Sequence, residues 1–257
     1  MTSARRAFVS DIHGNTPALE AVLADIDRRG IPETWCGGDL VGYGPDPEGC
    51  IRLIVKHARR CIMGNHDWAL LNDPIGFNPV AAEAIACNRR IMGEHCYVGV
   101  RPGCADWNWL RALPDGSEEP GLLNVHASPR DRLSEYVLAS DVAYGPSDKI
   151  VDIFSRFERL CVVGHSHRPG IVTPDFRWLR PEDLPEGLIM RKGGKYLLND
   201  GSVGQPRDGD NRACYAEVDG DRLIFHRVAY DYKKTMEMIY KVGCLAPICA
   251  ERLAIGR

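Results

Sequence analysis

Short apolar runs recur along the first two thirds of the chain, and each of them ends abruptly in polar residues. Runs of this length, bounded by Gly and polar side chains, are typical of buried strands that break into loops. Five of the runs are followed by Asp, Asn or His. They are residues 8–10 before Asp11 and His13, 34–36 before Asp39, 61–63 before Asn65 and His66, 122–125 before His126, and 160–163 before His165 and His167.

Two helices are predicted directly after the first two strands. Each begins with a capping residue followed by proline, Thr16-Pro17 in the first and Asp46-Pro47 in the second, with Thr16 and Asp46 as the N-caps. Alternation of strand and helix predicts βαβ units and hence a partly parallel sheet. Apolar residues at helical spacing form the faces expected to cover that sheet: Leu19, Val22, Leu23 and Ile26, then Ile51, Ile54, Val55 and Ala58.

The pattern changes between residues 68 and 119, where helices are predicted over 78–93 and around 107–110. Because this helical insertion separates the third polar strand end from the fourth, we expect it to roof the site. The later elements are predicted by the same patterns. They are a helix over 148–159, an irregular Pro-rich excursion over 176–195, a strand over 196–199, a hairpin over 214–228 and a helical end over 231–253 that breaks at Gly243.

Composition narrows the class of protein. The 257 residues are 44% hydrophobic, which is enough for one large α/β domain over residues 1–257. The formal net charge of −3 gives no basic field, so nucleic acid is not expected as a partner. No run is long and apolar enough to span a membrane, and the first strand follows the N-terminus at once, so the sequence predicts a cytoplasmic protein. The ten cysteines contain no C-x-x-C pair and are expected to be reduced thiols.

The polar residues at the strand ends are suited to binding metal. Open α/β sheets gather ligands at the carboxyl ends of their strands. Residues i and i+2 of an extended chain point to the same side, so Asp11 with His13, and His165 with His167, can each bind one ion. Carboxylate and imidazole together suit Mn, Fe, Co or Zn better than Ca or Mg. The predicted ligands are Asp11, His13, Asp39, Asn65, His126, His165 and His167.

In chain order these strand ends spell D-x-H, G-D, G-N-H-D, H and G-H-x-H over residues 11–167. The combination resembles the calcineurin-like metallophosphoesterase family. Residues 40–45 and 201–208 resemble a bacterial and archaeal branch related to diadenosine tetraphosphatases and small phosphodiesterases, with Asp200 as a departure. The resemblance implies an α/β fold, a four-layer α/β/β/α sandwich with two mixed sheets. It also implies two divalent transition metal ions about 3.5–4 Å apart, manganese first, with Fe, Zn, Co and Ni as alternatives.

The resemblance also implies a role for each residue of the site. Asp11, His13 and His167 would bind one ion, Asn65, His126 and His165 the other, and Asp39 would bridge the two. His66 would protonate the leaving oxygen, a step typically worth about 10²–10⁴-fold. We expect Tyr43 to stack on a nucleobase. Trp68, Trp107 and Trp109 could do so too, although packing is the favoured role for Trp107 and Trp109. Arg130, Arg132 and Arg207 are expected to contact further phosphates.

These residues predict a dinuclear metal-dependent hydrolase of phosphate esters, acting on a phosphodiester or on a nucleotide such as a dinucleotide polyphosphate. Phosphoprotein phosphatases of the family carry Glu where Asp67 stands, with Arg soon after it, whereas Trp68 follows here. A phosphoprotein phosphatase is therefore the alternative, and a nuclease lacks a basic stripe. A catalytically silent scaffold of the same fold is expected to lack some of the ligand residues, and this sequence retains all of them.

Overall fold

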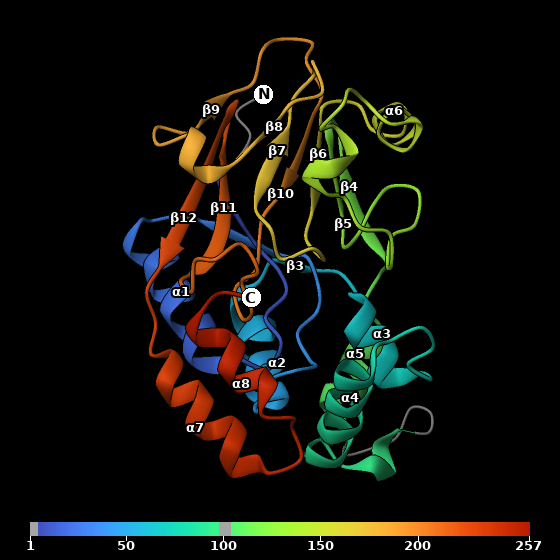
Figure 1. Cartoon of the computed structure of the whole chain (residues 1–257), viewed down its shortest axis with the longest axis vertical. Helices are drawn as coiled ribbons and strands as arrows, with labels where there is room; N and C mark the ends of the chain where they lie inside the picture. Colours follow the sequence, from blue (N-terminus) through green and yellow to red (C-terminus); the bar gives the residue numbers. More distant parts are fainter. Residues whose placement is uncertain (1–4, 98–103) are drawn as a thin grey trace.

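The computed structural model describes residues 5–97 and 104–257, which form two six-stranded sheets (Figure 1). In the first sheet β1, β2 and β3 are parallel, and β11, β12 and β9 join them in antiparallel pairs. Its order is β3 (Arg60–Cys61), β2 (Glu33–Cys36), β1 (Arg6–Val9), β11 (Ala213–Asp219), β12 (Arg222–Val228) and β9 (Leu188–Ile189).

The second sheet is mixed as well. Its three central strands β5, β6 and β10 are parallel, and the other pairs are antiparallel. Its order is β4 (Gly116–Glu119), β5 (Leu122–Val125), β6 (Leu160–Val163), β10 (Tyr196–Asn199), β7 (Gly170–Val172) and β8 (Trp178–Leu179). The hairpin predicted over 214–228 is β11 with β12.

Alternating side chains along the strands build four layers. Ala7 and Val9 of β1 pack in the cluster that holds the apolar faces of α1 (Thr16–Arg28) and α2 (Pro47–His57), whereas Phe8 packs in the cluster between the sheets. On the other sheet, Cys161 packs with α6 (Asp148–Ser155), and its neighbour Val162 packs inward. Because successive residues of a strand point to opposite faces, each sheet meets helices on one side and its partner sheet on the other. The four-layer α/β/β/α sandwich is confirmed.

The remaining helices lie below the sheets in Figure 1. Helix α4 shares an apolar cluster with the C-terminal helices, in which Ala84 and Cys87 pack with Ile239 and Cys249. The helical C-terminal end breaks at Gly243, which has the left-handed conformation of a helix C-cap. These helices are α3 (Asn65–Leu71), α4 (Pro79–Ile91), α5 (Ala105–Arg111), α7 (Tyr232–Val242) and α8 (Ile248–Glu251). Within the described ranges, none is long and apolar enough to cross a bilayer.

Three details of the predicted helices were wrong. Asn15, not Thr16, caps α1, because its side chain reaches the backbone N–H of Ala18 at 3.2 Å. Val55 is 52% exposed and lies outside the buried face of α2. Helix α6 ends at Ser155, since Phe157 turns into the core before β6 begins.

Residues 176–195 are not the irregular excursion predicted from their prolines. They include β8, which pairs with β7 at the edge of the second sheet, and β9, which pairs with β12 at the edge of the first. Strands of two residues carry no periodic signal of their own, so only their tertiary partners define them. The segment therefore links the edges of the two sheets.

The segment predicted as a helical insertion over 68–119 is helical only in part. Its first helix α3 already begins at Asn65, and its last four residues form β4 of the second sheet. Residues 98–103 of the segment lie outside the described part of the chain. Because the segment ends as a strand of the sandwich, it is built into the main fold at that end.

Four of the ten cysteines are disulfide-bonded, which corrects the prediction of reduced thiols throughout. Cys87 bonds Cys244, 157 residues away, and Cys96 bonds Cys104, with a Cα–Cα distance of 5.6 Å in both pairs. Packing of α4 against the segment after α7 brings the first pair together, a juxtaposition that sequence spacing does not reveal. The other cysteines, Cys36, Cys50, Cys61, Cys161, Cys214 and Cys249, are free thiols as predicted.

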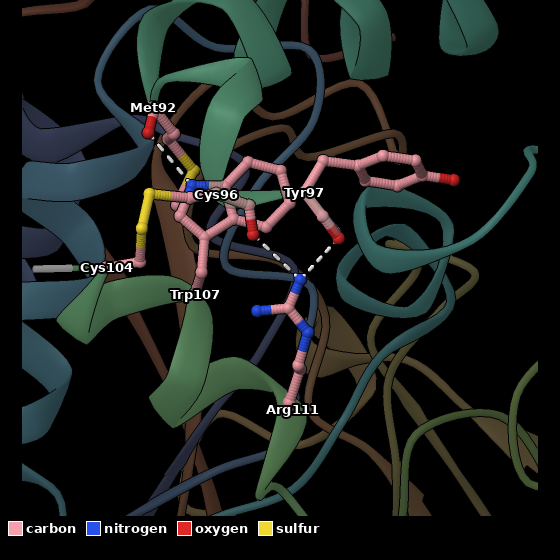
Figure 2. The surroundings of a disulfide bond; sticks show 6 residues. All are labelled: Met92, Cys96, Tyr97, Cys104, Trp107 and Arg111. Atoms are coloured by element: carbon pink, nitrogen blue, oxygen red, sulfur yellow. Dashed lines mark hydrogen bonds between the residues drawn. A yellow bond between two sulfur atoms is a disulfide. The ribbon is translucent and has the colours of Figure 1, made fainter. Parts of the chain in front are cut away.

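The Cys96–Cys104 disulfide and the indole of Trp107 belong to one apolar cluster and are drawn beside each other in Figure 2. Trp107 is 1% exposed, and its Nε1 donates a hydrogen bond to the Met92 carbonyl at 2.9 Å. Arg111 donates to the carbonyl of Cys96 at 2.9 Å. Trp107 therefore packs the end of α4 onto α5, which is the packing role that the sequence analysis favoured for it.

Candidate metal centre

The loops that follow the strands are joined to one another by backbone hydrogen bonds. Ile12 and His13 both donate to the carbonyl of Asp39, at 2.8 and 2.9 Å, and Asp11 donates to the carbonyl of Gly38 at 3.1 Å. These bonds fix the loop after β1 against the loop after β2. The predicted ligands of the two loops therefore lie side by side.

The predicted ligands adopt an uncommon backbone conformation. Positive φ angles occur at seven of the described non-glycine residues, and five of the seven are predicted ligands with φ of 48–61°: Asp11, His13, Asp39, His165 and His167. For a residue with a Cβ this left-handed region costs about 1–2 kcal/mol. Such strain persists only where the surroundings impose it, and it gathers at functional sites. The concentration of strain at the predicted ligands supports a functional role for this cluster.

Two glycines allow the close contacts of the cluster. A Cβ on Gly64 would lie 2.1 Å from Asp39 Oδ1, and a Cβ on Gly42 would lie 2.2 Å from His66 Nδ1. Neither distance is compatible with any other residue, and Gly42 also has a φ of 86°. These two glycines let the backbone of two loops approach the functional side chains.

One group of ligand atoms gathers around His13. Its Nε2 lies 3.1 Å from His167 Nε2, 3.6 Å from Asp39 Oδ2 and 3.8 Å from Asp11 Oδ1. His167 Nε2 is in turn 3.2 Å from Asp11 Oδ1. Asp11, His13 and His167 are buried, and each offers one atom to a common centre.

The hydrogen bonds behind these imidazoles determine which nitrogen carries the proton. His13 Nδ1 lies 2.8 Å from the Val41 carbonyl, and His167 Nδ1 lies 2.5 Å from the Gln205 carbonyl. A carbonyl only accepts, so both Nδ1 atoms donate and both neutral rings present bare Nε2 lone pairs to each other. Asp11 Oδ1, which faces them, is buried without a hydrogen-bond partner. Three converging acceptors with no donor between them fit a cation.

A second group gathers around His126. Its Nε2 lies 3.0 Å from Asn65 Oδ1 and 3.4 Å from Asp39 Oδ2, while its Nδ1 donates to the Gly37 carbonyl at 2.9 Å. His165 belongs to the same group with Asp39 and His126. His165 Nε2 lies 3.1 Å from the Ser134 carbonyl, which leaves Nδ1 as its acceptor. This second group also fits a cation.

Asp39 is the residue that the two groups share. Its Oδ2 faces both His13 and His126, and its Oδ1 accepts a hydrogen bond from the His66 backbone at 2.7 Å. Burial opposes ionisation of this carboxyl, but the neighbouring imidazoles hold the pKa of Asp39 well below its usual value. The same pairing outweighs burial at His126 and raises the pKa of that imidazole to about 10. The site therefore attracts positive charge.

Asp67 positions Asp39 and was missed as a functional residue by sequence reasoning. Its buried carboxylate accepts hydrogen bonds from the backbone of Asp39, Leu40 and Gly64, at 2.7, 2.9 and 3.0 Å. Burial and the nearby Asp39 charge raise the pKa of Asp67 to about 7. A carboxylate three residues after Gly64 at the start of a helix is a capping signal that could have identified this role.

The imidazole of His66 lies beside the cluster and offers a ligand atom to a third possible metal group, with His13 and Asp39. Its ring centroid is 4.7 Å from those of His13 and Tyr43 and 4.9 Å from that of Phe77. Its Nδ1 is buried and has no hydrogen-bond partner. Burial lowers the pKa of His66 to about 4. An unpartnered imidazole next to the candidate metal centre is available to a bound substrate.

The prediction that Tyr43 stacks on a nucleobase does not fit its position. The ring is 6% exposed and lies against His13 and His66. The guanidinium groups of Arg207 and Arg252 lie over it, 5.5 and 5.9 Å from its centroid, so little of the ring is accessible to a base. Trp68, which is 36% exposed, is less covered. Arg252 comes from the last helical turn of the chain and was not among the predicted site residues.

Arg130 and Arg132 also lie elsewhere than predicted. Arg130 pairs with Glu135 and Asp152, at 3.3 and 3.5 Å. Arg132 pairs with Asp115 and Glu118, at 3.0 and 3.1 Å. Their charges are neutralised within the fold, and in the described ranges neither guanidinium contacts the metal-binding cluster. Arg207 alone of the three adjoins it, since its backbone donates to the His167 carbonyl at 3.1 Å.

The fold and this cluster define a class, the dinuclear metal-dependent phosphoesterases. The chain matches the family model of calcineurin-like phosphoesterases over residues 4–169, more than half of its length, and it belongs to that family. The matched range contains all seven predicted ligands.

Relatives extend the similarity over the whole chain. The uncharacterized protein MJ0912 of Methanocaldococcus jannaschii is 36% identical, with 100% of both chains covered. The crystal structure of a metallophosphoesterase from Sphaerobacter thermophilus is 33% identical with a TM-score of 0.78, covering 99% of both chains. A symmetrical bis(5'-nucleosyl)-tetraphosphatase of Chromobacterium violaceum is 25% identical, over 76% of this chain and 67% of its own.

Proposed function

We propose that this protein hydrolyses phosphodiesters or nucleotides, dinucleotide polyphosphates among them, with two divalent transition metal ions. One observation carries the proposal. His13 and His167 present unprotonated Nε2 atoms 3.1 Å apart beside the orphaned Asp11 Oδ1, and Asp39 joins this group to a second one around His126. Such an arrangement of acceptors is stable when cations lie among them.

In this proposal Asp11, His13 and His167 bind one ion, and Asn65, His126 and His165 bind the other. Asp39 serves both ions. Bound ions of this kind neutralise phosphate charge and lower the pKa of water from 15.7 to about 7. Imidazole and carboxylate ligands favour manganese, with Fe, Zn, Co and Ni as alternatives.

His66 is the proposed general acid. Its unpartnered Nδ1 borders the ligand cluster, so a leaving oxygen can approach it. A nearby phosphate favours the charged form of an imidazole, which opposes the effect of burial on its pKa. His66 would then donate its proton as the ester bond breaks.

A small substrate is favoured over a phosphoprotein. The Chromobacterium relative is named as a symmetrical bis(5'-nucleosyl)-tetraphosphatase, which cleaves a compound of this class. Arg207 adjoins the cluster without a carboxylate partner, as a residue that contacts phosphate would. The proposal includes a cytoplasmic location and no nucleic-acid or membrane partner. A silent scaffold is disfavoured because all seven ligand positions are retained.

The test compares substrates on the full chain loaded with Mn²⁺. We expect bis(p-nitrophenyl) phosphate and diadenosine tetraphosphate to be cleaved, and a phosphoserine peptide to be cleaved more slowly. Asp39→Ala should abolish hydrolysis and lower the bound metal measured by elemental analysis. Asp152→Ala, which removes an exposed carboxylate of α6, is the matched control. Faster cleavage of the phosphopeptide, or at most one ion bound by the unaltered chain in saturating Mn²⁺, would contradict the proposal.

A further inference from the structure

A cavity of about 790 Å³ opens beside the candidate metal centre. Five stretches of the sequence line it, so no single sequence motif predicts it. Its volume lies within the range of small-molecule sites. Among its lining residues are Arg168, Trp178, Arg180, Arg207, Arg252 and Arg257.

The cavity adjoins the metal-binding cluster through residues that neighbour one predicted ligand. Arg168 directly follows the predicted ligand His167, and the backbone of Arg207 donates to the carbonyl of that same ligand at 3.1 Å. The guanidinium group of Arg207 lies over Tyr43, whose other contacts are His13 and His66. A substrate held at the metal centre can therefore extend into this cavity.

Two half-buried arginines converge here without an Asp or Glu partner in the described part of the chain. Arg207 Nη2 lies 2.7 Å, and Arg252 Nη1 3.4 Å, from the same neutral oxygen, Gln205 Oε1. Both guanidinium groups also lie over the ring of Tyr43. Arg252 Nε donates to the main-chain oxygen of Arg257 at 2.6 Å. In the described part of the chain, no Asp or Glu carboxylate lies within 4.0 Å of either guanidinium group.

The acidic residues that line the cavity do not compensate these two charges. Asp208 pairs with Arg227, and Glu182 lies 3.9 Å from Arg180. Burial and the neighbouring Arg207 charge lower the pKa of Arg252, which indicates the cost of holding two like charges together. Bound anions would relieve this repulsion, and guanidinium groups match phosphate oxygens in a bidentate manner.

We propose that this cavity binds a chain of linked phosphates, the part of the substrate that lies beyond the scissile phosphate, through Arg207 and Arg252 with Arg168 at its rim. The inference rests on the proposed phosphoesterase function and narrows its substrate class to compounds with several phosphates. The Trp178 side of the cavity is left for the remainder of the substrate.

The test measures binding of inorganic tripolyphosphate to the full chain by calorimetry. EDTA is kept in the buffer because polyphosphates chelate metal ions. We expect saturable binding that orthophosphate does not match, and Arg252→Gln should weaken it about tenfold or more, the scale of one charge-assisted hydrogen bond. Arg156→Gln is the matched control, since it removes an exposed arginine that pairs with Asp152 on α6. Equal binding by the unaltered chain and Arg252→Gln would overturn the proposal.

A second variant and a second ligand complete the test of the cavity. If Arg252→Gln does not fold, the exposed Arg168→Gln replaces it, and unchanged tripolyphosphate binding by that variant would overturn the proposal. Tighter binding of diadenosine tetraphosphate than of tripolyphosphate identifies a nucleotide as the source of the phosphates, and equal binding identifies the phosphate chain alone. Both results support the cavity's role. If the protein binds tripolyphosphate saturably but hydrolyses none of the substrates, the proposed hydrolase activity is refuted and the proposed phosphate site is not.

Discussion

His66 is buried between Tyr43 and Phe77, and its Nδ1 has no partner. We expect His66→Ala to retain both metal ions, because in the proposal the seven predicted ligands, Asp39 among them, bind the ions without His66. Turnover should fall by about 10²-fold or more on substrates with poor leaving groups, which need a proton as they depart. Kinetics with an alkyl and a p-nitrophenyl diester, together with metal analysis, measure both effects.

The comparison between leaving groups is the control for His66. A p-nitrophenolate departs without protonation, so its hydrolysis should be slowed far less. Equal losses on the two esters would show that His66 supports the structure of the site and does not act as the acid. Loss of metal in the variant would give it a role in binding the ions.

Asp200, the departure from the family pattern, lies behind Asp11. Ser10 Oγ is 2.6 Å from both Asp11 Oδ2 and Asp200 Oδ1. A hydroxyl has one proton to donate, so if Ser10 donates to Asp11 the Asp200 carboxyl must donate to Ser10. Burial raises the pKa of Asp200 well above its usual value, in agreement with a protonated carboxyl. Asp200 therefore helps to hold Asp11 through Ser10.

Asp200→Asn should make stability less dependent on pH. A folded pKa above the unfolded one means that the folded state binds the proton more tightly. Stability from this group is then present in full below about pH 4 and is lost as the pH rises. Asn cannot ionise and can still donate to Ser10. Between pH 5 and pH 8, the free energy of unfolding of the unaltered chain should fall by at least about 1 kcal/mol more than that of the variant. Urea unfolding at the two pH values measures this difference.

Asp221→Asn, at the exposed hairpin turn, is the control for the Asp200 experiment. A difference between Asp200→Asn and the unaltered chain that is the same at pH 5 and pH 8 would show that Asp200 is not held protonated in the fold.

At the residue scale, the sequence brought together the predicted ligands because each one follows a strand within a few residues. The side chains around them were harder to predict. Arg252 reaches the site from the end of the chain, and Arg130 and Arg132 turn away to acidic partners that lie close only in the folded protein. Long side chains can reach several partners, so sequence proximity to a ligand does not predict their contacts.

At the scale of elements, helix α4 supports the loop that follows the bridging residue. Asn88 of α4 is fully buried and accepts a hydrogen bond from Gly42 N at 2.6 Å, and its Nδ2 donates to the Gly44 carbonyl at 3.0 Å. This one side chain satisfies two backbone groups on either side of Tyr43. Helix α4 is thus part of the site's support, although none of its residues is a predicted ligand.

Asn88→Ala should destabilise the protein and impair the site. Two buried backbone groups would lose their partners, which typically costs about 1–3 kcal/mol for each unsatisfied group. Because the loop packs against His66 through Gly42, we expect lower activity on every substrate as well. Urea unfolding and diester kinetics test this. The control is Asn72→Ala, which removes an exposed hydrogen bond at the end of α3. Equal stability of the two variants would contradict the role of Asn88.

The longer elements were predictable for a physical reason. Strands β1, β2, β5, β6 and β10 and helices α1 and α2 carry enough apolar residues in a regular period to define them. Strands β8 and β9 have two residues each and exist only through their pairing partners. The four-layer architecture itself came from the family resemblance, since periodicity alone predicted only the α/β class.

At the scale of the whole molecule, the Cys87–Cys244 disulfide joins α4 to the segment after α7. It thereby links the helix that supports the Tyr43 loop to the part of the chain that carries Arg252. Disulfides are uncommon in reducing compartments, whereas the location proposed for this protein is the cytoplasm. The oxidation state of the cysteines therefore bears on both the stability of the site and the location of the protein.

Counting thiols tests this arrangement directly. The ten cysteines include two disulfide pairs, so the protein denatured without reductant should react with six equivalents of a thiol reagent, and with ten after reduction. Because a disulfide restricts the unfolded chain, we expect reduction to lower the free energy of unfolding by about 2–5 kcal/mol. Replacing Cys87 and Cys244 together by serine should reproduce most of this loss, whereas Cys214→Ser removes a free thiol as the control. Ten reactive thiols in protein alkylated before cell lysis would show that the pairs are reduced in the cell, as a cytoplasmic protein requires.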